Sequence, residues 1–146
     1  MIEFVSTCDD PDQLRKIARN AAIKGAIQLQ RAAKLRLFSI LPQEAPGTLE
    51  YEVWQSIFAL EDALSDERGK TIRLSRTRQK IGRQDERSCV ADLVRGSESD
   101  GFRMLAERDM LELSFEAVAL RFPELFDENV LQSARSRLEN AGYDNS

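Results

Sequence analysis

Apolar residues recur at helical spacing along this chain, and that periodicity constrains its fold more than any other feature. No stretch alternates apolar and polar residues for more than a few positions, as a half-buried strand would. The 146 residues are enough for one domain with its own core, without help from metal ions or disulfides. We therefore predict an all-α fold, a compact bundle of about six to seven helices with no substantial sheet, which spans residues 1–146 as a single domain.

Residues 1–41 predict an N-terminal helical hairpin. Asp10 is placed to cap the first helix, and Pro11 suits its first position. Lys24-Gly25 is typical of a turn, and a second apolar stripe then continues to Leu41-Pro42. Alanines line the inward faces of both helices, so the two helices can pack closely.

Residues 48–83 predict a long helical region that is acidic in its first part and basic in its second. Thr48 can cap it, and the apolar stripe that follows is flanked by Trp54 and Phe58. This is the most hydrophobic segment of the chain, so we expect it at the centre of the core. Gly69 is expected to end or interrupt the helix.

Residues 88–142 predict a series of short helices. Ser88, Ser114 and Asp127 can each cap one of them, and a loop is expected from Arg95-Gly96 to Gly101. Gly142 is expected to end the last helix.

The chain contains no histidine, which removes many catalytic chemistries. Ser-His-Asp and Cys-His sites and histidine-bound metal centres are excluded, and there is no glycine-rich phosphate loop of the G-x-x-x-x-G-K type. Cys8 and Cys89 are isolated and are interpreted as plain thiols. We expect a non-enzymatic protein with no cofactor and no metal. A carboxylate-metal hydrolase would need acids such as Glu61, Asp62 and Glu116 to gather.

Neither a membrane span nor a secretion signal is evident in the sequence. No apolar run approaches the roughly 20 residues that cross a bilayer. The first residues, Met-Ile-Glu-Phe-Val, lack the basic-then-apolar order of a signal peptide. We therefore predict a cytoplasmic protein with no membrane partner.

Charge is distributed unevenly along the chain, although the net charge is only −4. Residues 44–67 carry seven acids and no base, and residues 68–83 carry seven bases and no acid. An acid-free basic segment in an acidic chain suggests a polar field across the molecule. The candidate nucleic-acid-binding residues are the seven basic ones: Arg68, Lys70, Arg73, Arg76, Arg78, Lys80 and Arg83.

On a helix covering residues 70–83, the basic side chains would form a ridge. Arg73, Arg76, Lys80 and Arg83 fall within a sector of about 80° at 3.6 residues per turn. Arginines in such a ridge suit phosphate oxygens, which guanidinium groups contact bidentately. The competing interpretation is that the preceding acidic helix, Glu61–Glu67, neutralises the segment, or that solvent simply surrounds it.

The chain also bears a resemblance to known proteins. Residues 1–41, with Ala18-Arg19-Asn20-Ala21, Lys24-Gly25, Ala32-Ala33 and Arg36-Leu37, resemble a short helical module of uncharacterised bacterial proteins, some of them joined to restriction-type nucleases. The remainder, with Arg68-Gly69-Lys70-Thr71 and Arg76-Thr77-Arg78-Gln79-Lys80, is similar to other small bacterial proteins. The resemblance implies an accessory role near DNA. No nuclease motif follows the module, so it carries over no catalytic residue.

Two functions therefore remain open at the level of sequence. The first is a non-enzymatic accessory protein that binds nucleic acid through its basic helix at 68–83. The alternative is a protein-protein interaction module or homo-oligomer that uses apolar helix faces, either Trp54–Phe58 or the Phe122–Phe126 corner.

Overall fold

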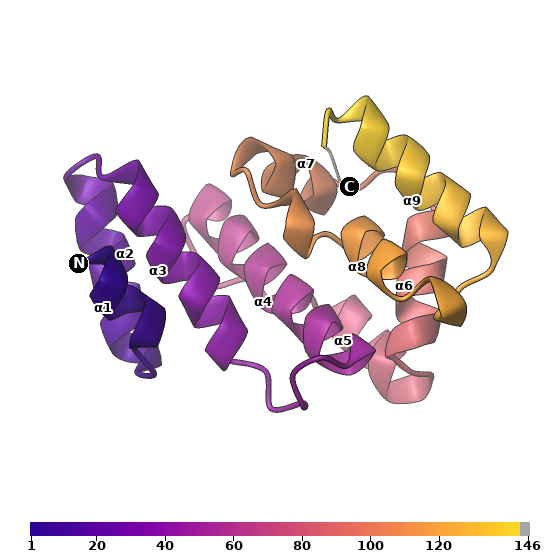
Figure 1. Ribbon diagram of the computed structural model, residues 1–146, viewed down its shortest axis with the longest axis horizontal. Coiled ribbons are helices and arrows are strands. Elements are labelled where there is room, and N and C mark those ends of the chain that lie inside the picture. The colour runs from indigo at the N-terminus through magenta and orange to yellow at the C-terminus, as the bar shows by residue number, and fades with distance from the viewer. Residues whose placement is uncertain (144–146) are drawn as a thin grey trace. The chain divides into compact units, whose positions relative to one another are not determined.

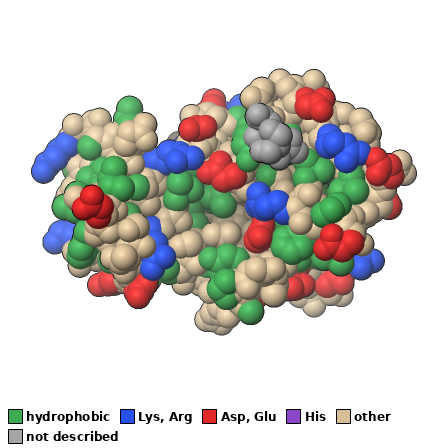
Figure 2. Space-filling view, in the orientation of Figure 1, with side chains coloured by type: hydrophobic (Ala, Val, Ile, Leu, Met, Phe, Trp, Pro, Cys, Tyr) green, Lys and Arg blue, Asp and Glu red, His purple; other side chains and the backbone are tan. Residues whose placement is uncertain are grey.

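The computed structural model describes residues 1–143, and within that range the chain is helical with no strand. The predicted all-α class is confirmed. The chain divides into two compact units, Met1–Gln43 and Glu44–Ser146 (Figure 1). Within each unit, on the face drawn in Figure 2, acidic and basic side chains are interspersed. That residues 1–146 behave as a single domain stays a prediction.

The first unit consists of α1 (Ile2–Thr7), α2 (Pro11–Ile23) and α3 (Ile27–Ile40). Helices α2 and α3 pack extensively against each other and are joined by a short turn in which Gly25 adopts φ +71°. Their small side chains meet as the sequence predicts, because Ala18, Ala21 and Ala33 are all buried. Asp10 caps α2 by accepting from the backbone N–H groups of residues 12 and 13.

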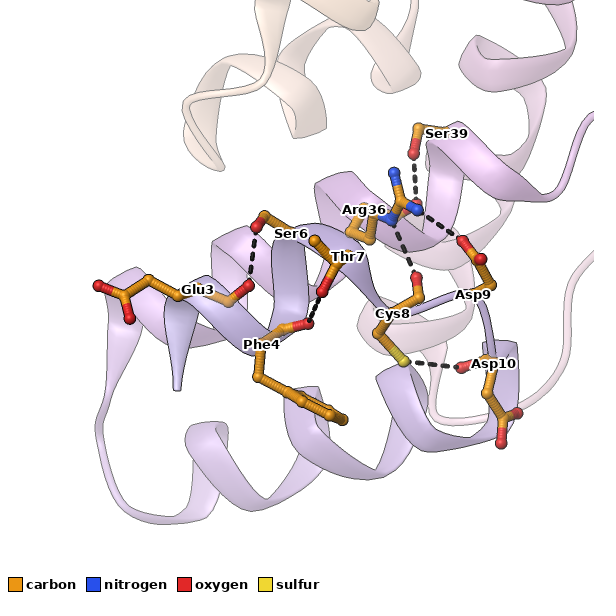
Figure 3. A network of polar contacts seen from close by, with 9 residues as sticks. All are labelled: Glu3, Phe4, Ser6, Thr7, Cys8, Asp9, Asp10, Arg36 and Ser39. Atoms are coloured by element: carbon orange, nitrogen blue, oxygen red, sulfur yellow. Dashed lines mark hydrogen bonds and ion pairs between the residues drawn. The ribbon is translucent and has the colours of Figure 1, made fainter.

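Helix α1 was not predicted from the sequence, because it has no capping side chain and only six residues. A tertiary contact holds its C-terminal end to α3 (Figure 3). The Arg36 guanidinium on α3 donates to the carbonyl of Cys8 at 2.9 Å and to the carboxylate of Asp9 at 2.6 Å. Val5, the buried residue of α1, is 1% exposed and supplies its apolar anchor.

The second unit is built around α4 (Leu49–Arg68), which Thr48 caps as predicted. Its buried stripe includes Val53, Ile57 and Leu60, and it contacts α6, α7 and α8. The expectation that α4 lies at the centre of the core is confirmed for the second unit. The unit also contains α5 (Ser75–Arg83), α6 (Glu86–Arg95), α7 (Asp100–Glu107), the 3₁₀ turns η1 (Leu111–Leu113) and η2 (Pro123–Leu125), α8 (Phe115–Arg121) and α9 (Glu128–Asn140).

Several predicted boundaries are corrected by the structure. Residues 1–143 hold nine α-helices and two 3₁₀ turns, more than the six to seven expected. Asp85, not Ser88, caps α6, because its carboxylate accepts from the backbone N–H of residue 88. Ser99 caps α7, which opens at residue 100 instead of 102. The predicted caps Ser114 and Asp127 are confirmed.

The Arg36 contact yields the first prediction. Arg36→Ala should free the end of α1, because it removes the hydrogen bonds that join the Cys8 carbonyl and Asp9 to α3. A net hydrogen bond contributes about 1 kcal/mol, so amide hydrogen exchange across residues 2–8 should quicken about fivefold or more. Arg15→Ala is the matched control, since Arg15 pairs with Asp12 on its own helix. Equal exchange in both variants would contradict this role for Arg36.

Candidate nucleic-acid interface

The basic segment is not one continuous helix. Helix α4 ends at Arg68, where Gly69 adopts the left-handed conformation with φ +69°. Residues 70–74 are non-helical, and α5 covers only Ser75–Arg83. The predicted helical region 48–83 is therefore interrupted. Arg73 lies before α5 and is not part of a four-residue helical ridge.

A buried carboxylate on α4 fixes the position of α5. Glu61 is 9% exposed and accepts three hydrogen bonds from the basic segment. The Arg78 guanidinium donates through Nε at 2.7 Å and Nη2 at 2.8 Å, a bidentate pair. The backbone N–H of Leu74 donates the third bond at 2.8 Å, just before α5 begins. The hydrogen bond to Glu61 raises the pKa of Arg78 above its usual value.

The same guanidinium lies against two aromatic rings of α4. It sits 5.2 Å from the centroid of Trp54 and 5.8 Å from that of Phe58, which is within cation–π range. Trp54 in turn donates its indole N–H to Glu86 on α6 at 3.1 Å. We call Glu61, Arg78, Trp54 and Phe58 the Arg78 anchor. Arg78 joins α5 to α4 in this anchor, so this predicted site residue is used inside the fold.

A second predicted cation is also paired internally. Lys80 Nζ lies 2.7 Å from the Asp92 carboxylate on α6. Hydrogen bonds from Lys80 and then from Arg95 lower the pKa of Asp92. The acids of α4 and α6 therefore neutralise two members of the segment, which is part of what the competing interpretation of the sequence expects.

The link between α4 and α5 is hydrogen-bonded as well. The backbone N–H of Ile72 donates to Ser65 Oγ on α4 at 2.8 Å. Together with the Leu74 bond to Glu61, this contact attaches residues 70–74 to the side of α4.

The remaining five predicted site residues are exposed and outside these contacts. Across residues 1–143, none of the five has an ion pair or a side-chain hydrogen bond. Arg87, exposed in the first turn of α6, was missed by the sequence reasoning because acids flank it at positions 85 and 86. The five exposed cations are Arg68, Lys70, Arg73, Arg76 and Arg83.

The acids suggested for a metal-carboxylate site are occupied by other contacts. Glu61 holds Arg78, and Glu116 holds Arg137 at 2.5 Å. Among residues 1–143, no three His, Cys, Asp or Glu side chains gather as metal ligands would. Cys8 and Cys89 are free and buried, and burial raises the pKa of the Cys89 thiol to about 11. In that same range, none of the helices has the length and apolar character that a membrane span requires.

Comparison with protein-family models, with curated proteins and with solved structures finds no match to this chain. The resemblance to bacterial helical modules therefore stays a prediction.

The Arg78 anchor yields the second prediction. Glu61→Gln keeps the side-chain shape but leaves Arg78 without a charged partner at a largely buried position. We expect a loss of about 1–3 kcal/mol in the free energy of unfolding of the second unit. Urea unfolding followed by the fluorescence of Trp54, the chain's single tryptophan, measures it.

Arg103→Gln is the control for this experiment, because its pairs with Glu67 and Glu107 are exposed. Surface pairs contribute little, so the control should unfold close to the parent chain. If Glu61→Gln were no more destabilised than Arg103→Gln, the anchor would not be what holds α5.

Proposed function

We propose that this chain is a non-enzymatic accessory protein that binds nucleic acid through the five exposed cations of its basic segment. The observation that carries the proposal is their exposure in a stretch, residues 68–83, that contains no acid. Phosphate is the ligand class that suits such a surface, because arginine contacts phosphate oxygens bidentately and lysine adds point charge.

The Arg78 anchor supports the proposal in a second way. A nine-residue helix is too short to be stable alone in water. Anchored by Glu61, α5 is ordered before any ligand arrives, so binding need not supply the free energy that orders the backbone. The internal pairs leave Arg73, Arg76 and Arg83 unaffected.

The third prediction concerns the salt dependence of binding. The triple variant Arg73→Gln, Arg76→Gln, Arg83→Gln should weaken binding to fluorescent duplex DNA, single-stranded DNA or RNA, whichever the parent binds. The log–log slope of affinity against salt should fall in magnitude by up to about 2.7 for a duplex, because each phosphate that is no longer neutralised removes about 0.9. Fluorescence anisotropy at a series of salt concentrations measures both quantities.

A triple variant in the first unit controls for net charge. Lys16→Gln, Arg19→Gln, Lys24→Gln removes the same three charges from exposed positions on α2 and its turn. This control should retain most of the binding and the salt slope. If the parent binds no nucleic acid near 50 mM salt, where such binding should be strong, or if both triple variants lose binding equally, the proposal fails.

The alternative function is a protein-protein interaction module or homo-oligomer. The surface that favours it is not one of the two predicted from the sequence, Trp54–Phe58 and Phe122–Phe126. Trp54 and Phe58 lie against Arg78, and Phe126 is buried. The first unit instead exposes large apolar side chains on α1 and around the turn between α2 and α3. These are Met1, Ile2, Phe4, Ile23 and Ile27, from 50% to 78% exposed.

The fourth prediction tests this alternative. If these exposed apolar side chains of the first unit form an interface, the parent chain should self-associate. The double variant Ile23→Ser, Ile27→Ser should then shift it toward the monomer. Light scattering coupled to size exclusion, over a wide range of concentration, measures the mass. A parent that stays monomeric throughout, and whose mass does not respond to the variant, would rule out the homo-oligomer.

A further inference from the structure

We propose that α5 enters the major groove of duplex DNA and reads base edges with its exposed face. This inference rests on the proposed nucleic-acid function and narrows it to one ligand, the DNA duplex. It begins from the pattern of exposure along α5. The exposed residues fall within a sector of about 120° at 3.6 residues per turn, and they are Ser75, Arg76, Gln79, Gly82 and Arg83.

The protein holds α5 on both flanks of this exposed sector, because Arg78 and Lys80 each lie about 40° beyond one of its edges at 3.6 residues per turn. Arg78 is held by Glu61 and Lys80 by Asp92, and these contacts set the rotation of the helix about its own axis. The helix has no buried residue, so it lies on the surface of its unit and is not embedded in it. A helix attached in this way can enter a groove about 12 Å wide, the width of the major groove of B-DNA.

The long side chains on the exposed face are of the types that read bases. Arg76 and Arg83 can each donate two hydrogen bonds to guanine, and Gln79 can pair with adenine in the same bidentate manner. The face has no acidic side chain to repel phosphate and no large apolar side chain that a protein partner would bury. Its composition therefore favours DNA over an apolar protein surface.

The short residues of the face permit close approach. Gly82 lies inside α5, where glycine weakens a helix relative to alanine. A Cβ atom added there would meet nothing within 4 Å, and the backbone does not adopt positive φ. The fold therefore gives no reason for glycine at this position. Close approach of the helix surface to a groove wall would be such a reason. Ser75, on the same face, is also small.

Cations lie beyond both ends of this face. Lys70 and Arg73 precede the first residue of α5, and Arg87 follows its end across the turn to α6. A helix in the major groove is bordered by two phosphate backbones, which these cations can contact. Double-stranded RNA fits less well, because its major groove is too deep and narrow for side chains. Single strands are usually bound by aromatic platforms, and the face has no aromatic side chain.

The fifth prediction uses substitutions at Gly82 and Gln79. Gly82→Ala should raise the midpoint of thermal unfolding by about 1–4 °C and, by holding the helix away from the groove, weaken duplex binding about fivefold or more. Gln79→Ala should lower the preference for the best site over a mutated site by about fivefold to a hundredfold. The preferred site is first selected from duplexes with a randomised core of about 12 base pairs, and affinities are then measured by anisotropy.

Lys70→Gln is the comparison variant. Lys70 is expected to contact phosphate, so its loss should weaken binding to every duplex equally. The inference is overturned if no preferred sequence emerges, if double-stranded RNA of the same sequence binds as tightly, or if Gly82→Ala binds as the parent does. In each of these cases, binding that the Arg73, Arg76, Arg83 triple variant still weakens would leave the proposed function standing. Loss of the groove-reading role and loss of nucleic-acid binding altogether are therefore distinguishable.

Discussion

The carboxylate of Glu61 is the group on which the arrangement of the second unit's basic segment depends. Glu61 is only 9% exposed, and burying an unpaired charged group is costly, so its carboxylate needs partners. It is paired by the bidentate guanidinium of Arg78 and by the backbone N–H of Leu74. Because these donors lie on both sides of the first residue of α5, one acid sets where α5 begins and which way it faces. The rings of Trp54 and Phe58 lie within cation–π range of the same guanidinium.

This arrangement reconciles two interpretations that the sequence left in competition. The acidic part of α4 does neutralise the basic segment, but only where Glu61 meets Arg78, and Asp92 on α6 does the same for Lys80. The paired cations border the exposed face of α5 on its two flanks and serve as structural anchors. The exposed cations keep their charge on the outer side, where a polyanion could reach them. Internal neutralisation and an open cationic surface therefore coexist on one short helix.

Features set by neighbouring residues could be predicted from the sequence, whereas contacts between distant residues could not. The caps at Asp10, Thr48, Ser114 and Asp127 were found because a capping side chain bonds a backbone N–H only two or three residues away. The all-helical class followed from periodicity in the same way. Helix α1 had no such signal, since a distant arginine holds it in place.

The same limit applies to the candidate site. Seven bases follow seven acids along the chain, and composition alone cannot say which base pairs with which acid. The pairing of Glu61 with Arg78 depends on where α4 stops and how the link folds back, which Gly69 and Ser65 help to decide. A ridge drawn on an unbroken helix therefore placed Arg73 on the wrong element.

The contacts that place α5 also bear on how the chain folds. They join residues 7, 13 and 17 positions apart, from Ser65 to Ile72 and from Glu61 to Leu74 and Arg78. Loops this short close with little loss of entropy, and elements joined by local contacts form early. The contact of Arg137 with the carbonyl of Gly96, by comparison, spans 41 positions. The contacts of α5 with α4 are thus expected to form before α8 and α9 pack, so destabilising α9 should leave α5 attached to α4.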